Sequence, residues 1–217
     1  AGFWRIALAI PFLLILCPLA RQPIGRIDRR LIGFIAIGGL CFAADLASWH
    51  VGILQTTLAN ATLFGNSATL IFPIYGFLIA RAWPNRSQGT ALLLALVGAM
   101  LLMGRSASLS HKQLVGDLLC LLAGVLYTGY FIVMSRARAR LQPLPVLAIS
   151  TIASAPPLLI TAWLLGERIL PGDWTPLIAL ALASQVFGQG LITYALGQLS
   201  PLVIGIGLLI QPIVAAT

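Results

Sequence analysis

Charged side chains are scarce in this chain. They make up 8% of its residues, and only 5 residues are acidic, whereas about a quarter of the residues of an average soluble domain are charged. Hydrophobic residues make up 59%, and the mean hydropathy is +1.00. This balance excludes a water-soluble globular domain, so the sequence predicts an all-α integral membrane protein.

Cysteine is also scarce, and the patterns that carry enzyme chemistry are missing. Cys17, Cys41 and Cys120 lie in apolar stretches without CxxC spacing, so we expect neither a disulfide nor a metal site. The sequence has no GxSxG and no glycine-rich phosphate loop, and Gly116–Gly124 lies inside an apolar stretch. We therefore expect no enzyme, no cofactor and no ATP-binding site.

Apolar segments fill most of the chain, and eight of them approach the length of about 20 residues that a helix needs to cross a bilayer. The predicted spans are Gly2–Ala20, Leu31–Leu54, Leu58–Ala80, Gly89–Gly104, Leu114–Ser135, Val146–Leu165, Trp174–Leu196 and Ser200–Thr217. The first could pass for a signal peptide, but Leu16 is too large for a lipoprotein cleavage site and further spans follow. The chain begins without Met and ends inside an apolar run, so we expect a fragment of a longer protein.

Basic residues gather in the loops on one side of the membrane. We therefore interpret the net charge of +8 as a feature that orients the chain in the bilayer, and we expect no nucleic acid as a partner. The other side holds only Arg105, Lys112 and Arg168, so the positive-inside rule predicts that the richer side is cytoplasmic, in a bacterial inner membrane. The richer side holds Arg21, Arg26, Arg29, Arg30, Arg81, Arg86, Arg136, Arg138 and Arg140.

The order of spans and turns repeats within the chain. A shift of 143 residues places the first three spans on the last three without gaps, with Ile35 on Ile178 and Gln55 on Gln198. The first span runs inward and the sixth outward, so the two repeats are inverted. Five helices per repeat fit this pattern, as in many transporters.

Four stretches of the sequence resemble the EamA-type branch of the drug/metabolite transporter superfamily. They are Thr56–Asn66, Gly89–Leu102, Leu126–Arg136 and Gly188–Pro212. The resemblance implies a ten-helix bundle of two inverted five-helix repeats, of which about eight helices are present. Residues 1–104 would form the first repeat without its first helix, and residues 114–217 the second repeat without its last.

The sequence departs from the family's pattern in the first repeat. The family usually has a proline partway along its fourth helix, where this chain has Thr69, with Pro73 one turn later. The family usually ends that helix in a glutamate, where this chain has no acid between Arg81 and Pro84. The matching proline of the second repeat, Pro212, is present.

Asp45 is the first candidate functional residue, because it is an acid inside an apolar run. Such acids are functional by default, as a proton site or as a ligand for an ammonium group, although an acid can also bind a neighbouring helix for packing alone. Trp49 lies four residues later on the same helix face. A relay to His50 is not favoured, because a spacing of five residues places the two side chains about 140° apart.

Polar and aromatic residues on other spans are further candidates for lining a cavity. Asn60 and Asn66 either line it or hold helices together, whereas Thr62 and Ser67 favour the second role. Tyr127 and Tyr130 share one face, where they either stack on a ligand or anchor the span at the membrane interface. Gln185 and Gln189 also share one face, and Gln211 precedes the kinking Pro212. Asp117 is interpreted as stabilising the positive end of its helix. The candidate substrate or coupling residues are Asp45, Trp49, Asn60, Asn66, Tyr127, Tyr130, Gln185, Gln189 and Gln211.

These observations favour a secondary transporter that exports small metabolites such as amino acids, amines or drugs by alternating access. Proton coupling through Asp45 and exchange down a gradient both stay open as the driving force. A metabolite importer is the first alternative, and a non-transporting membrane subunit or sensor is the second. The expected partners are a small-molecule substrate and the lipid bilayer, and a homodimer stays open.

Overall fold

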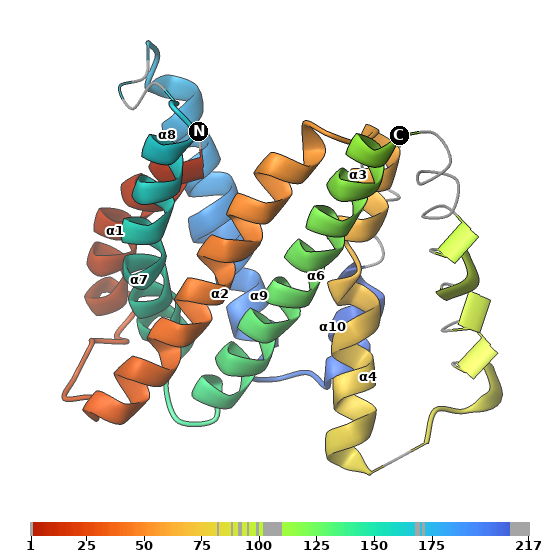
Figure 1. The fold of residues 1–217 in the computed structure, drawn as a ribbon. Coiled ribbons are helices and arrows are strands. Elements are labelled where there is room, and N and C mark those ends of the chain that lie inside the picture. Colours follow the sequence, from red (N-terminus) through yellow and green to blue (C-terminus); the bar gives the residue numbers. More distant parts are fainter. Residues whose placement is uncertain are drawn as a thin grey trace. The chain divides into compact units, whose positions relative to one another are not determined.

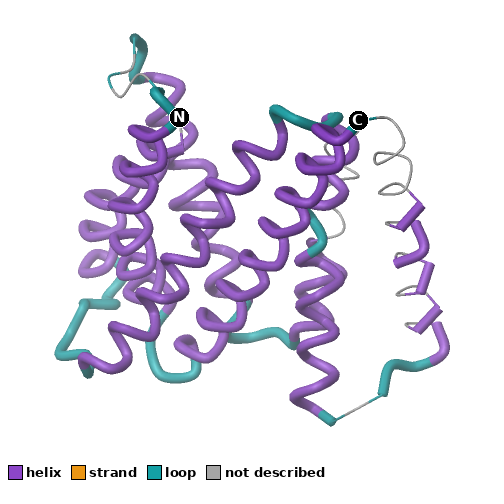
Figure 2. The backbone as a smooth tube through the Cα atoms, viewed as in Figure 1, coloured by secondary structure: helices purple, strands orange, loops and turns teal. Residues whose placement is uncertain are grey.

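All regular secondary structure in the described part of the chain is helical (Figure 2). The computed structural model describes residues 2–81, 83–87, 89–90, 93–94, 96–98, 100–101, 110–167, 170 and 172–208. Six segments in these ranges are long and apolar enough to cross a membrane. Part of the fourth predicted span, Gly89–Gly104, and the end of the eighth, from residue 209 on, lie outside the described residues.

Two compact units make up the chain, and each combines two separate stretches of sequence. Unit 1 contains Ala1–Leu46 and Gly129–Leu199, and unit 2 contains Ala47–Thr128 and Ser200–Thr217. Helices α2 (Arg29–Ile53) and α6 (His111–Arg138) each contribute one end to either unit. Each unit takes residues from both halves of the chain, and the two inverted repeats stay a prediction.

The core of unit 1 forms where α1 (Gly2–Leu19) packs against α7 (Pro143–Leu164), as Figure 1 shows. Buried apolar residues of both helices meet the first residue of a π-helix, η1 (Ala181–Gly188), which α8 (Thr175–Leu180) precedes and α9 (Gln189–Ala195) follows. The cluster comprises Ala9, Leu13, Cys17, Leu147, Ala148 and Ala181. The seventh predicted span is therefore present, but its middle is wound as a π-helix, a feature that often marks functional sites.

Glycine permits the closest helix approach in unit 1. A Cβ on Gly39 of α2 would run into the carbonyl oxygen of Ser150 and lie 2.9 Å from the Cβ of Ala153, both on α7. The hydroxyl of Ser154 donates to the carbonyl of Gly39 over 2.8 Å at the same contact. Small residues and such hydrogen bonds are the usual means by which helices associate in membranes.

In unit 2, the third predicted span is interrupted rather than continuous. Helix α3 (Leu58–Gly65) ends before Asn66, and α4 (Ala68–Ala80) begins two residues later. The amide of Asn66 donates to the carbonyl of Thr62 over 2.8 Å, which is a side-chain bond that competes with helix continuation. Helix α10 (Pro201–Leu208) packs against α4, where Gly76 faces Pro201.

Many large apolar side chains on the spans are exposed. Leu78 is 73% exposed, Leu164 is 70% exposed and Trp163 is 69% exposed. Exposed apolar surface on this scale is costly in water and favourable in lipid tails. Together with the six spans, it makes the chain a multi-pass membrane protein.

We expect Gly39→Ala to destabilise the protein by about 1–3 kcal/mol, because the added methyl group overpacks a contact with the α7 backbone. Gly33→Ala in the same helix is the matched control, since its Cβ would meet nothing within 4 Å. Thermal unfolding of both variants in detergent measures the difference. Equal midpoints for the two variants would contradict the close approach.

Candidate functional site

Two ionisable side chains lie inside the membrane-spanning helices of unit 1, Arg5 on α1 and Asp45 on α2, close enough for the arginine charge to act on the acid. We call these two residues the charge pair. Arg5 also lies over the ring of Phe42, with its guanidinium carbon 5.8 Å from the ring centroid. An opposite charge and an aromatic face both lower the cost of holding a charged group in an apolar medium.

Aromatic rings continue from this pair towards α6. The rings of Phe42 and Tyr130 stack with centroids 4.8 Å apart, and Phe131 lies 6.0 Å from Tyr130. Tyr130 is completely buried, and its hydroxyl is close to the hydroxyls of Ser150 and Thr193. Tyr130 therefore lies in the interior of unit 1, between Phe42 of α2 and the polar groups on α7 and α9.

Buried polar side chains gather between α7, η1 and α9. The amide of Gln185 donates to the hydroxyl of Thr151 over 3.1 Å, whereas its carbonyl oxygen has no protein partner among the described residues. Such a buried acceptor costs about 1–3 kcal/mol unless water or a ligand supplies a donor. The polar cluster comprises Ser150, Thr151, Ser154, Gln185, Gln189 and Thr193, all of them buried.

A second buried carboxylate organises unit 2. Asp117 is completely buried on α6, where Thr56 donates its hydroxyl to one carboxylate oxygen. The amide of Asn60 donates to both carboxylate oxygens, over 3.1 and 3.2 Å. The interpretation of Asp117 as a residue of the helix start is therefore wrong, because it lies in the second turn and joins α6 to α3.

The predicted site residues divide between the two units. Unit 1 contains Asp45, Tyr130, Gln185 and Gln189, and unit 2 contains Trp49, Asn60, Asn66 and Tyr127. In unit 2, Trp49 packs against Gly65, Asn60 binds Asp117 and Asn66 follows the end of α3. Gln211 lies outside the described residues.

Two ionisable side chains of these networks were not among the candidate site residues. Arg5 lies in the first predicted span, and Asp117 was interpreted as stabilising a helix end. The rule that ionisable residues inside spans are functional by default singles out both. No group of three metal-binding side chains exists among the described residues.

Thr56→Val is expected to lower the free energy of unfolding by about 1.5–3 kcal/mol, the usual worth of a hydrogen bond to a charged group. Thr62→Val is the matched control, because its hydroxyl bonds only the carbonyl of Leu58 in its own helix. Chemical unfolding of the two variants in detergent micelles compares them. A loss of stability no larger than that of Thr62→Val would show that the Thr56 bond contributes nothing.

Comparison with known proteins agrees with the resemblance for one half of the chain. The model of the EamA-like transporter family matches residues 114–217, which include α6, α7, η1, α9 and α10. A search of curated proteins finds no match. Residues 114–217 are therefore similar to the EamA-like transporter family, in agreement with the resemblance of the sequence to EamA-type transporters.

Proposed function

We propose that the protein is a secondary transporter that exports small metabolites, with the charge pair and polar cluster of unit 1 forming part of its substrate site. The observation that carries this proposal is the grouping of Arg5, Asp45, Tyr130 and Gln185 in helices that cross the membrane. Polar groups at membrane depth mark substrate and ion pathways. The family of residues 114–217 supports transport as the activity.

The chemistry of these residues favours substrates that carry an ammonium group and an apolar or aromatic part. The Asp45 carboxylate and the free carbonyl oxygen of Gln185 accept hydrogen bonds, while the ring of Tyr130 offers a stacking surface. Arg5 supplies an opposite charge for a carboxylate. Amino acids, amines and many drugs fit this description.

The charge pair also provides a route for coupling to protons. A proton on Asp45 would neutralise the carboxylate and release Arg5 from its attraction, so protonation and substrate binding would compete for the same pair. Alternating access would then arise from motion between two inverted five-helix repeats, with the arginine-rich loops in the cytoplasm of the cell.

Expression of the protein in a bacterial host, with any flanking sequence its gene encodes, is expected to enrich one or a few small amines or amino acids in the medium. Untargeted metabolite profiling against a vector control measures this enrichment. Depletion of a compound from the medium would indicate import instead. An unchanged medium, with the protein inserted in the membrane, would contradict transport of these substrate classes.

Asp45→Asn is expected to reduce transport of the identified compound at least tenfold while the protein still inserts, since the neutral amide cannot bind a proton or balance Arg5. Asp28→Asn is the matched control, because Asp28 is exposed in the loop before α2. Transport into proteoliposomes at several pH values separates the two variants. Normal transport by Asp45→Asn across the pH range would assign Asp45 a packing role.

A further inference from the structure

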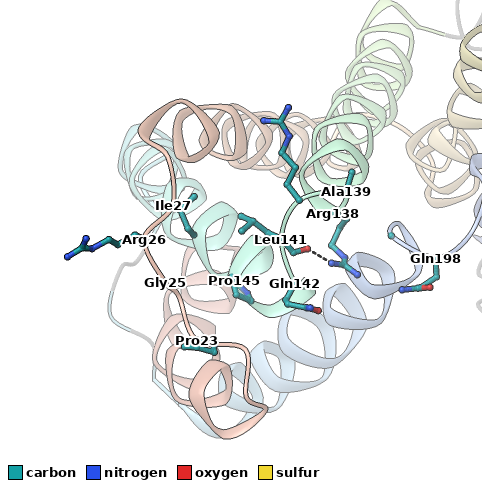
Figure 3. Close-up of a pocket in the computed structure, with 12 residues that line it drawn as sticks. Pro23, Gly25, Arg26, Ile27, Arg138, Ala139, Leu141, Gln142, Pro145 and Gln198 are labelled. Carbon is teal, nitrogen blue, oxygen red and sulfur yellow. Dashed lines mark hydrogen bonds between the residues drawn. The ribbon is translucent and has the colours of Figure 1, made fainter.

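A cavity of about 510 Å³ lies in unit 1 where several helices end (Figure 3). Its walls come from the loop between α1 and α2, from the turn between α6 and α7, and from residues that follow α9. The lining residues are Pro23, Gly25, Arg26, Ile27, Arg138, Ala139, Arg140, Leu141, Gln142, Pro145, Gly197 and Gln198. The cavity thus lies at the ends of membrane-spanning helices, which is the depth of the lipid headgroups in a bilayer.

Positive charge dominates the lining. Arg26, Arg138 and Arg140 contribute guanidinium groups, Gln142 and Gln198 contribute amides, and no lining residue is acidic. Arg26 lies at the rim and points outward in Figure 3, and Arg140 is exposed, so both long side chains are free to turn towards a bound anion. Arginine is well suited to phosphate, because its planar donors match two oxygens at once.

The guanidinium of Arg138 is already held in place. Its Nε donates to the carbonyl of Thr193 over 3.0 Å, and its Nη1 donates to the carbonyl of Leu141, the bond drawn in Figure 3. Gly197 makes room for it, since a Cβ there would lie 2.6 Å from Nη2. A guanidinium has five N–H donors, so most of those on Arg138 remain for a ligand after these two bonds.

The N-terminus of α7 offers no free backbone N–H group to an anion in the cavity at its first three residues. Pro143 and Pro145 have no N–H group, and the N–H of Leu144 donates to the side chain of Gln22 over 3.2 Å. An anion in the cavity would therefore be bound by side chains rather than by a helix end.

Apolar surface beside the cavity suits a ligand with acyl chains. Ile24 is 41% exposed between the lining residues Pro23 and Gly25, and Leu199 is 48% exposed next to Gln198. Basic pockets between membrane helices on the cytoplasmic side are sites for anionic headgroups.

We propose that this cavity binds a phosphate group at the membrane surface, carried by an anionic phospholipid or by a soluble phosphate ester. The site is separate from the charge pair of the proposed transport site, so its test does not depend on transport. Binding there would hold together the ends of α6, α7 and α9.

Purified full-length protein in phosphatidylcholine nanodiscs provides the test, with short-chain phosphatidylglycerol and inorganic phosphate as the probes. We expect phosphatidylglycerol to raise the thermal midpoint, and R26Q/R140Q to weaken this binding about tenfold or more, since each arginine near the surface contributes about 1 kcal/mol. The control R29Q/R30Q removes the same charge from residues at the start of α2 that do not line the cavity. Arg138 is left unchanged, because its bonds to Thr193 and Leu141 are structural.

The two probes distinguish the sources of the phosphate. Binding of phosphatidylglycerol that R26Q/R140Q alone weakens, without competition by phosphate, supports a lipid headgroup. Binding of inorganic phosphate that the same variant weakens supports a soluble ester. Equal effects of both double variants, or equal shifts with added phosphatidylcholine, would overturn the proposal.

Discussion

A bilayer offers no hydrogen-bond partner to a polar group inside it, and this constraint decides how the few polar side chains of this chain are used. Asp117 receives donors from Thr56 and Asn60, and Asp45 faces the charge of Arg5. In both units, an acidic side chain inside a predicted span meets a polar or charged side chain from another part of the chain. The apolar residues supply the spans, and these polar contacts specify which helices meet.

Close packing and polar contacts depend on each other in this protein. Gly39 lets α2 approach α7, and at that contact Ser154 reaches the Gly39 carbonyl. In unit 2, Gly116 lies against Gln55 and Thr56, and the next residue, Asp117, accepts the hydrogen bond of the Thr56 hydroxyl. Short polar side chains span only a few ångströms. Helices that approach closely at a glycine therefore bring such side chains within hydrogen-bond distance of their partners.

The sequence predicted the parts of the fold that follow from composition and length. Spans such as Gly2–Ala20 and Val146–Leu165 agree with α1 and α7 within three residues at either end, because apolar length alone defines them. The break at Asn66 and the π-helix were not predicted, since both depend on local hydrogen bonds that periodicity does not reveal. Asp117 was misinterpreted because its partners come from residues about 60 positions earlier. The approach of Arg5 to Asp45 likewise joins residues of two different spans, which the sequence pattern does not reveal.

The trio of Thr56, Asn60 and Asp117 constrains how this sequence can change over time. Removing one hydrogen-bond partner of a buried charged group typically costs about 1.5–3 kcal/mol, whereas replacing both partners by apolar groups of the same shape can be nearly neutral. Each single substitution is thus disfavoured, although the triple replacement need not be. We therefore expect these three positions to change together, so that related sequences either keep all three residues or have replaced all three.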